Sequence, residues 1–235
     1  MNTQAAEIDP RARIIVAFDL PTAEAALALV RELSPHPGLF KIGLQLYTAA
    51  GPEIVHAVRE LGGRIFLDLK LHDIPNTVGR AVESANSLGV EMLTLHLSGG
   101  RSMVEAGARA ADPGMLLLGV TVLTSADETT LRETGIGSPV EEQVLRLAQL
   151  GVESGLPGLV ASPHELAPLR AAFGGGIKIV TPGIRPAGPA ADDQKRAMTP
   201  IEALRAGADF LVIGRPITAA KDPRSALERI VADVV

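Results

Sequence analysis

The sequence predicts a single α/β domain over residues 1–235, folded as one (β/α)8 barrel. Short apolar runs alternate eight times with longer amphipathic stretches, a pattern typical of parallel strands joined by helices. The apolar runs are nearly continuous, as in strands that are covered on both faces. One such barrel needs about 250 residues. The chain has 235 residues with no linker or shift in composition, so eight units favour a closed barrel over an open, doubly wound sheet.

The expected elements follow one another in strict alternation. Strands are predicted over residues 14–20, 40–46, 64–71, 92–98, 115–124, 158–162, 178–184 and 210–217. Helices are predicted over residues 21–33, 53–61, 77–88, 102–111, 140–154, 200–206 and 223–234, and from Pro163, since proline is favoured at the first helical position. Helix ends are expected at Gly62, Gly89, Gly151 and Gly207. Residues 185–199 form a loop long enough to indicate a function.

Composition limits the possible functions. A net charge of −5 and the lack of a basic run argue against a nucleic-acid partner. The chain has no Cys, which excludes disulfides, thiolate metal sites and a cysteine nucleophile. The N-terminus lacks the apolar segment of a secretory signal, and no apolar run reaches the ~18 residues of a membrane span. We therefore expect a cytoplasmic protein that does not enter a membrane.

Polar residues gather where the predicted strands end, which is the rim that carries the active site in barrels of this kind. Asp68 and Lys70 are two residues apart in one strand, so strand alternation should point both into the barrel mouth. With Lys41 and Asp73 they would form an array of two cations and two anions. Ion pairs that only hold strands together are the alternative, but buried pairs of that kind stabilise weakly. The array therefore favours a catalytic site.

A second group of residues indicates a phosphate site. The segments TPGIRP and GRP end the seventh and eighth predicted strands, where barrels frequently bind a phosphate. Gly183 and Gly214 would let backbone N–H groups approach an anion, and Arg185 and Arg215 would add bidentate bonds. Gln194, in the long loop, would fold over the same group. Turn glycines with solvated arginines are the alternative for either segment taken alone.

The five histidines do not form a set of metal ligands. His96 is predicted to be a satisfied residue of the barrel interior, and His72 is predicted to face away from the site. A magnesium site made only of carboxylates, at Asp68 and Asp73, stays open.

The run DLKLHDIPNT at residues 68–77 resembles the signature of the orotidine 5′-phosphate decarboxylase family. The resemblance covers nearly the whole chain, because VAFDL, FKIGLQL, VTPGIRP, DDQKR and ADFLVIGRPIT also match in the right order. The segment HLSGG at residues 96–100 departs from the family pattern, in which small residues are more usual after the histidine. It touches no expected catalytic group.

The resemblance implies a decarboxylase that makes uridine 5′-monophosphate (UMP) from orotidine 5′-monophosphate (OMP) with no cofactor and no metal. Lys70 would donate a proton to C6 of the pyrimidine, and Asp68 would lie against the departing carboxylate. Asp73 and Thr77 would reach into the neighbouring subunit's site, so the active form would be a homodimer. Lys41 would serve both the charged array and the substrate. The implied substrate-binding residues are Asp19 and Lys41 at the ribose, Thr124 at the pyrimidine, Arg185, Gln194, Gly214 and Arg215 at the phosphate, and Pro182 and Thr77.

Three other functions stay open. A sugar-phosphate decarboxylase or isomerase of related barrel type would use the same Asp-x-Lys-x-x-Asp motif with magnesium. An aldolase would use Lys70 as a Schiff-base amine, but that role needs an uncharged lysine, which neighbouring carboxylates disfavour. A catalytically inactive barrel would only bind a nucleotide, and the complete charged array argues against it.

Overall fold

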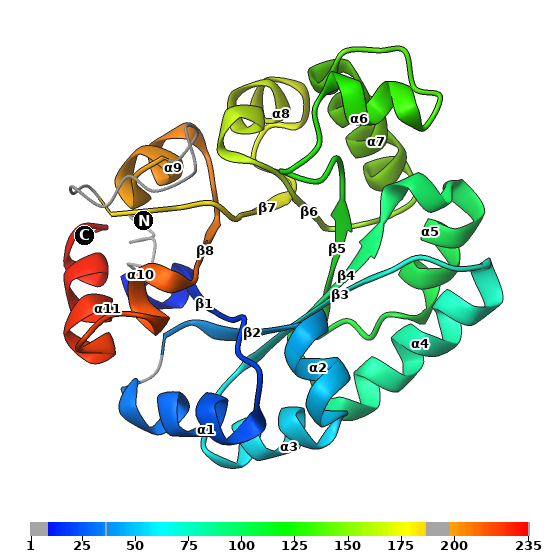
Figure 1. Cartoon of the computed structure of the whole chain (residues 1–235). Coiled ribbons are helices and arrows are strands. Elements are labelled where there is room, and N and C mark those ends of the chain that lie inside the picture. The colour runs from blue at the N-terminus through cyan, green and yellow to red at the C-terminus, as the bar shows by residue number, and fades with distance from the viewer. Residues whose placement is uncertain (1–8, 36, 187–197, 235) are drawn as a thin grey trace, which may run out of the picture.

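The computed structural model describes residues 9–35, 37–186 and 198–234. Over these residues eight parallel strands close into a barrel in sequence order, with the helices outside (Figure 1), and the predicted (β/α)8 fold is confirmed. The strands are β1 Ile14–Phe18, β2 Leu39–Gly43, β3 Ile65–Leu71, β4 Met92–His96, β5 Leu116–Val120, β6 Gly158–Val160, β7 Lys178–Thr181 and β8 Phe210–Ile213. The α-helices are α1 Ala23–Glu32, α2 Leu44–Ala50, α3 Glu53–Glu60, α4 Pro75–Leu88, α5 Arg101–Ala110, α6 Glu128–Glu133, α7 Val140–Glu153, α8 Leu166–Phe173, α9 Pro200–Ala206, α10 Arg215–Thr218 and α11 Pro223–Ala232.

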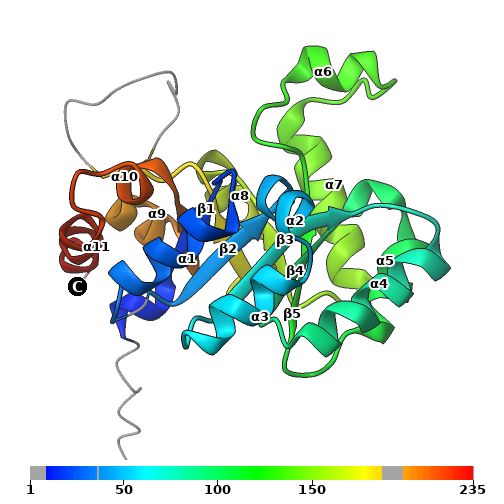
Figure 2. The same cartoon turned by 60° about the horizontal axis from the view of Figure 1, so that its bottom comes forward.

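Several predicted strands were too long at their C-terminal ends. Residues 44–46 belong to α2, and the residues after Gly214 form the short helix α10. An apolar run alone does not separate a strand from a short helix, and Pro216 near the start of α10 favours the helix. Helix α6 was not predicted; Asp127 caps it by accepting a bond from the backbone N–H of Thr130. Figure 2 shows that α6 and α10 lie at the same end of the barrel.

Two of the predicted helix boundaries were also displaced. Gly151 was expected to end a helix, but it lies inside α7. A Cβ atom there would come within 2.9 Å of Leu97, so this glycine allows close packing instead. Pro163 begins a short 3-10 turn, and α8 starts only at Leu166. Gly89 and Gly207 do end α4 and α9, and both adopt the left-handed backbone conformation.

The barrel has two apolar cores. The outer core fills the space between the strands and the helices, and includes Phe18 stacked on Phe40 with ring centroids 4.9 Å apart. The inner core fills the barrel itself, and it consists of Ile15, Ala17, Leu39, Phe66, Met92, Leu118, Val180 and Val212. Because side chains alternate along a strand, the inward-facing position that follows each inner residue lies one layer nearer the C-terminal rim. In four neighbouring strands that next position is polar.

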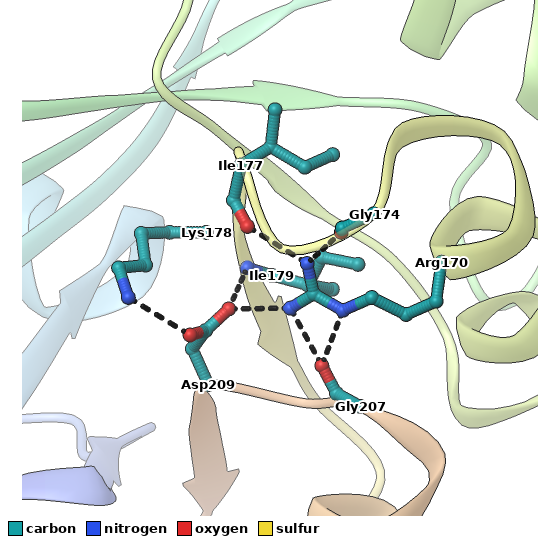
Figure 3. Close-up of polar contacts among 7 residues, drawn as sticks. All are labelled: Arg170, Gly174, Ile177, Lys178, Ile179, Gly207 and Asp209. Atoms are coloured by element: carbon teal, nitrogen blue, oxygen red, sulfur yellow. Dashed lines mark hydrogen bonds and ion pairs between the residues drawn. The ribbon is translucent and has the colours of Figure 1, made fainter.

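At the opposite end of the barrel, an ion-pair cluster joins β7 to β8 (Figure 3). Arg170 of α8 donates to the carbonyl oxygens of Gly174, Ile177 and Gly207, and its Nη2 lies 2.6 Å from Oδ2 of Asp209. The same Oδ2 accepts a bond from the N–H of Ile179 in β7, 2.8 Å away. Lys178 Nζ pairs with the other oxygen of Asp209 at 3.0 Å. The carboxylate of Asp209 therefore connects α8 with β7 at the start of β8, and Arg170 adds the bonds to the neighbouring turns.

The same arrangement recurs across the barrel, between β3 and β4. Glu91 comes just before β4, as Asp209 comes just before β8. Its Oε2 accepts from the N–H of Ile65 at 2.7 Å, and its own N–H donates to the carbonyl of Ile65. Arg64 pairs with its other carboxylate oxygen at 3.6 Å. Each of these two carboxylates accepts a hydrogen bond from the first part of the neighbouring strand. They lie at the N-terminal ends of opposite strand pairs, away from the polar rim.

None of the helices in the described part of the chain is long and apolar enough to span a membrane.

The Asp209→Asn variant is expected to lower the free energy of unfolding by about 1–3 kcal/mol, because Arg170 and the N–H of Ile179 lose a charged acceptor in a partly buried place. The matched control is Glu153→Gln, which breaks a more exposed ion pair with Arg101. The control should change stability much less, because exposed ion pairs contribute little. Urea denaturation of both variants provides the measurement, and equal losses in the two would contradict a special role for Asp209.

Candidate active site

The polar layer at the rim is built by strand alternation from the inner core. Asp19, Lys41, Asp68 and Thr94 each lie two residues beyond an inner-core residue of β1, β2, β3 and β4, in that order. In the strand register Lys41 lies beside Phe66 and Gly43 beside Asp68. Lys41 therefore starts one inward position below Asp68, and its long side chain reaches up to the carboxylates at the rim.

Four charged side chains of alternating sign meet at this rim, namely Asp19, Lys41, Asp68 and Lys70. Lys41 Nζ lies 3.2 Å from Oδ1 of Asp19 and 3.7 Å from Oδ2 of Asp68. Lys70 Nζ lies 2.9 Å from both oxygens of Asp68. Asp68 and Lys41 are well buried, with side chains 13% and 11% exposed. Because Asp68 contacts both lysines, its carboxylate is the centre of the array.

Lys70 does not reach Asp68 by the simple strand alternation that we expected. Leu67 pairs with Leu93 and Leu71 with Leu95, so three residues of β3 bulge opposite a single residue of β4. Lys70 lies in this bulge with φ 51°, and it is the one described non-glycine residue with positive φ. Such a conformation costs on the order of 1–3 kcal/mol and persists only where the surroundings enforce it. The local backbone is thus strained at the lysine that the sequence singled out.

Thr94 was missed by the sequence analysis, although it is the residue opposite the bulge. Its side chain is fully buried. Its Oγ1 accepts a bond from the backbone N–H of Lys70 and donates one to Oδ1 of Asp68, both at 2.9 Å. The available signal was its position two residues before His96 in a predicted strand, which gives it the same inward orientation as its charged neighbours.

A pocket of about 310 Å³ opens above the array. This volume lies at the lower end of the range for small-molecule sites. Its wall contains most of the residues that the sequence selected from the strand ends, namely Asp19, Lys41, Asp68, Lys70, Thr124, Pro182, Gly183, Arg185, Gly214 and Arg215. Gln194 lies outside the described residues.

The wall formed by the ends of β7 and β8 carries two arginines. Arg185 and Arg215 both line the pocket, and neither guanidinium forms an ion pair with another described residue. Gly183 has φ 78°, a conformation that glycine adopts without strain. The backbone N–H of Arg185 donates to the carbonyl of Met198, which holds the described ends of the long loop together. Two guanidinium groups without an ion-pair partner among the described residues, next to a glycine turn, can bind an anionic group of a ligand.

Asp73 and Thr77 lie outside this pocket in the single chain. Both are exposed, at the turn into α4 and on its first turn. Asp73 Oδ1 accepts a bond from the N–H of Ile74, and no ion pair joins it to a lysine within the described residues. Within one chain, Asp19 therefore completes the array in the place that we expected for Asp73.

His72 is exposed and does not line the pocket, and its ring lies 5.5 Å from that of His96. His96 is partly buried at the end of β4. Burial lowers the pKa of His96, the nearby His72 and Lys70 lower this pKa further, and Asp68 partly opposes them. Among the described residues, no three His, Asp or Glu side chains are grouped so that they could hold a metal ion.

A closed parallel barrel with paired lysines and carboxylates at its C-terminal rim, next to an arginine-lined wall, defines a barrel enzyme for a small anionic substrate. Comparison with known proteins identifies the family. The chain belongs to the orotidine 5′-phosphate decarboxylase / HUMPS family, whose model matches residues 12–230.

Named relatives agree over nearly the full length. An orotidine 5′-phosphate decarboxylase of Moorella thermoacetica is 52% identical over 94% of this chain and 92% of its own. One of Opitutus terrae is 53% identical over 94% and 97%. The crystal structure of orotidine 5′-phosphate decarboxylase from Lactobacillus acidophilus superposes with a TM-score of 0.84 and 36% identity, covering 94% of this chain and 98% of that one. The resemblance stated from the sequence is confirmed, and a magnesium-dependent sugar-phosphate enzyme is not favoured.

The lowered pKa of His96 predicts a contribution to acid sensitivity. The unfolded chain binds a proton at this residue more readily than the folded chain. The stability that the neutral ring contributes is therefore present above the unfolded pKa of about 6.5 and is lost as the pH falls through the lower folded value. His96→Asn should reduce the loss of unfolding free energy between about pH 7.5 and pH 5. Denaturation at a series of pH values measures it.

The matched control for this experiment is His56→Asn, because His56 is exposed on α3. The control should follow the wild-type pH profile. A wild-type profile for His96→Asn as well would show that this residue does not contribute.

Proposed function

We propose that the chain decarboxylates OMP to UMP without a cofactor or a metal, and that Lys70 and Asp68 carry out the chemistry. The observation that carries this proposal is the ion pair of Lys70 Nζ with both oxygens of Asp68, 2.9 Å each, at the wall of the pocket. The family of the chain and its named relatives support the same reaction.

The chemistry requires a fixed cation and a fixed anion. Loss of CO2 from C6 breaks the C6–carboxylate bond and leaves its electron pair on a ring carbon with no adjacent electron sink. An ammonium group placed at that carbon stabilises the developing charge and then donates the proton that forms the new C6–H bond. Lys70 takes this role, and the carboxylate of Asp68 lies where it repels the substrate carboxylate that departs.

The other residues of the layer bind the sugar and the base. Lys41 and Asp19, which pair at 3.2 Å, hold the ribose hydroxyls. Thr124 lines the same pocket from the loop after β5 and contacts the pyrimidine. Because Lys41 also contacts Asp68, ribose binding and the reacting groups are coupled through one side chain.

The phosphate of the substrate is placed at the wall formed by β7 and β8. Arg185 and Arg215 supply charge-assisted bonds, and Gly214 leaves room for the phosphate beside the backbone. Pro182 shapes the same wall, and Gln194 contacts the phosphate from the long loop. This group is remote from C6, so its binding energy can be used in the transition state.

We further propose that residues 1–235 form one cytoplasmic domain that works as a homodimer. Asp73 and Thr77 are exposed in the chain alone, and Ile74 between them is a large apolar side chain that is 66% exposed. Burial of this segment against a second copy would cover Ile74 and bring Asp73 to the partner's Lys70 array. The dimer would then have two shared active sites.

The Lys70→Ala variant should lose decarboxylase activity by about 10³-fold or more, because it removes the proton donor. The decrease in absorbance as OMP becomes UMP measures the rate, with EDTA present throughout. Wild-type turnover in EDTA is expected, since no metal takes part. The control Lys178→Ala removes a lysine at the other end of the barrel and should keep the wild-type rate. A Lys70→Ala variant that decarboxylates normally would overturn the assignment.

Mixing two inactive variants tests the shared sites. Lys70→Ala and Asp73→Asn subunits should each be nearly inactive alone. After random reassembly at equal amounts, each mixed dimer would contain one intact site, so about a quarter of the wild-type activity should return. Mixing Lys70→Ala with Asp68→Asn is the control and should restore nothing, because both changes fall in the same half of the site. No recovery in the first mixture would contradict donation of Asp73 across an interface.

A further inference from the structure

We propose that Thr94 is a positioning residue for the decarboxylation, a role that rests on the function proposed above. Its single hydroxyl holds the backbone of Lys70 and the carboxylate of Asp68 in one fixed arrangement. Thr94 does not line the pocket, so it acts only through these two residues.

The hydrogen bonds around Thr94 form a closed circuit. The N–H of Lys70 donates to Thr94 Oγ1, and this hydroxyl donates to Oδ1 of Asp68, each at 2.9 Å. Oδ1 also accepts from Nζ of the same Lys70 at 2.9 Å. The backbone and the side-chain tip of Lys70 are thereby tied to one carboxylate oxygen and one hydroxyl.

The bulge in β3 explains why a hydroxyl is needed here. The register shift between Leu67 and Leu71 takes the N–H of Lys70 out of the regular ladder, as bulges do. A threonine at the facing position of β4 replaces the missing backbone acceptor with a side-chain acceptor. A hydroxyl accepts and donates at the same time, so it satisfies the N–H and fixes the carboxylate together. No apolar side chain of the same shape can do either.

The geometry also separates this role from substrate affinity. The two arginines of the pocket follow β7 and β8, whereas Thr94 is on β4. Lys41 contacts Asp68 through Oδ2, the oxygen that Thr94 does not touch. A loss of the Thr94 hydroxyl should therefore displace Lys70 and Oδ1 of Asp68 and leave the phosphate wall in place.

The test compares Thr94→Val with Thr94→Ser. Valine keeps the shape and removes the hydroxyl, whereas serine keeps the hydroxyl. The matched control is Thr121→Val, because Thr121 is also a buried threonine of the barrel and bonds only to the carbonyl of Val160 in the described structure. For each variant kcat, KM and the Kd for UMP would be measured, and retained UMP binding would also show that the barrel has folded.

Thr94→Val is expected to lower kcat by about 10- to 100-fold, which is the effect of a small misplacement of reacting groups. Its Kd for UMP should stay within about threefold of wild type, since phosphate binding is separate. Thr94→Ser should regain kcat to within about fivefold, and Thr121→Val should behave as wild type. If Thr94→Val does not fold, Thr94→Ala replaces it with the same expected split between kcat and Kd.

Three results would overturn the proposal. A Thr94→Val enzyme with wild-type kcat would show that the hydroxyl does not position the reacting groups. Equal losses of kcat and UMP affinity, not rescued by serine, would indicate a general structural role. A wild-type chain that binds UMP but does not turn over OMP would overturn the proposed function itself, and this role with it.

Discussion

The pairing of alternating charges at the C-terminal rim of the barrel is the interaction on which the site depends. Charged groups are costly to bury unless they are paired and hydrogen-bonded. Asp68 meets this condition by contacting Lys41, Lys70 and the hydroxyl of Thr94. Replacing such a network with apolar side chains is often neutral or stabilising. The network is therefore better explained by chemistry at the pocket than by stability of the fold.

The contacts at one end of the barrel stabilise the fold, and those at the other end form the site. At the N-terminal ends of the strands, Asp209 and Glu91 satisfy backbone N–H groups and pair with basic residues. Between the ends, apolar side chains fill the interior. At the C-terminal rim the backbone of Lys70 is held in a strained conformation. A closed and well-packed lower barrel provides the rigid surroundings that such strain requires.

Much of the fold and of the site was predictable from the sequence because both leave local patterns. Continuous apolar runs such as IIVAF indicate strands that are buried on both faces. The amphipathic stretches between them indicate helices that are buried on one face. Asp19, Lys41 and Asp68 each follow a buried, inward-facing residue by two positions. This spacing is that of one face of a strand, so all three side chains could be expected at the same rim. The predictions failed where local patterns are ambiguous: residues 44–46 and 215–218 continue apolar runs but turn into helices.

The sequence by itself determined the strand order, three members of the charged array and the family, because periodicity, motif order and the run at residues 68–77 are properties of the chain alone. Only the tertiary structure decided the bulge at Lys70, the bridging role of Thr94 and the contact between His72 and His96. Each of these depends on the register between β3 and β4, whose residues are more than twenty positions apart in the sequence. The alternating pattern of a regular strand sets its register, but a bulge changes that register partway along the strand, and the alternation at residues 67–71 does not show where the change falls.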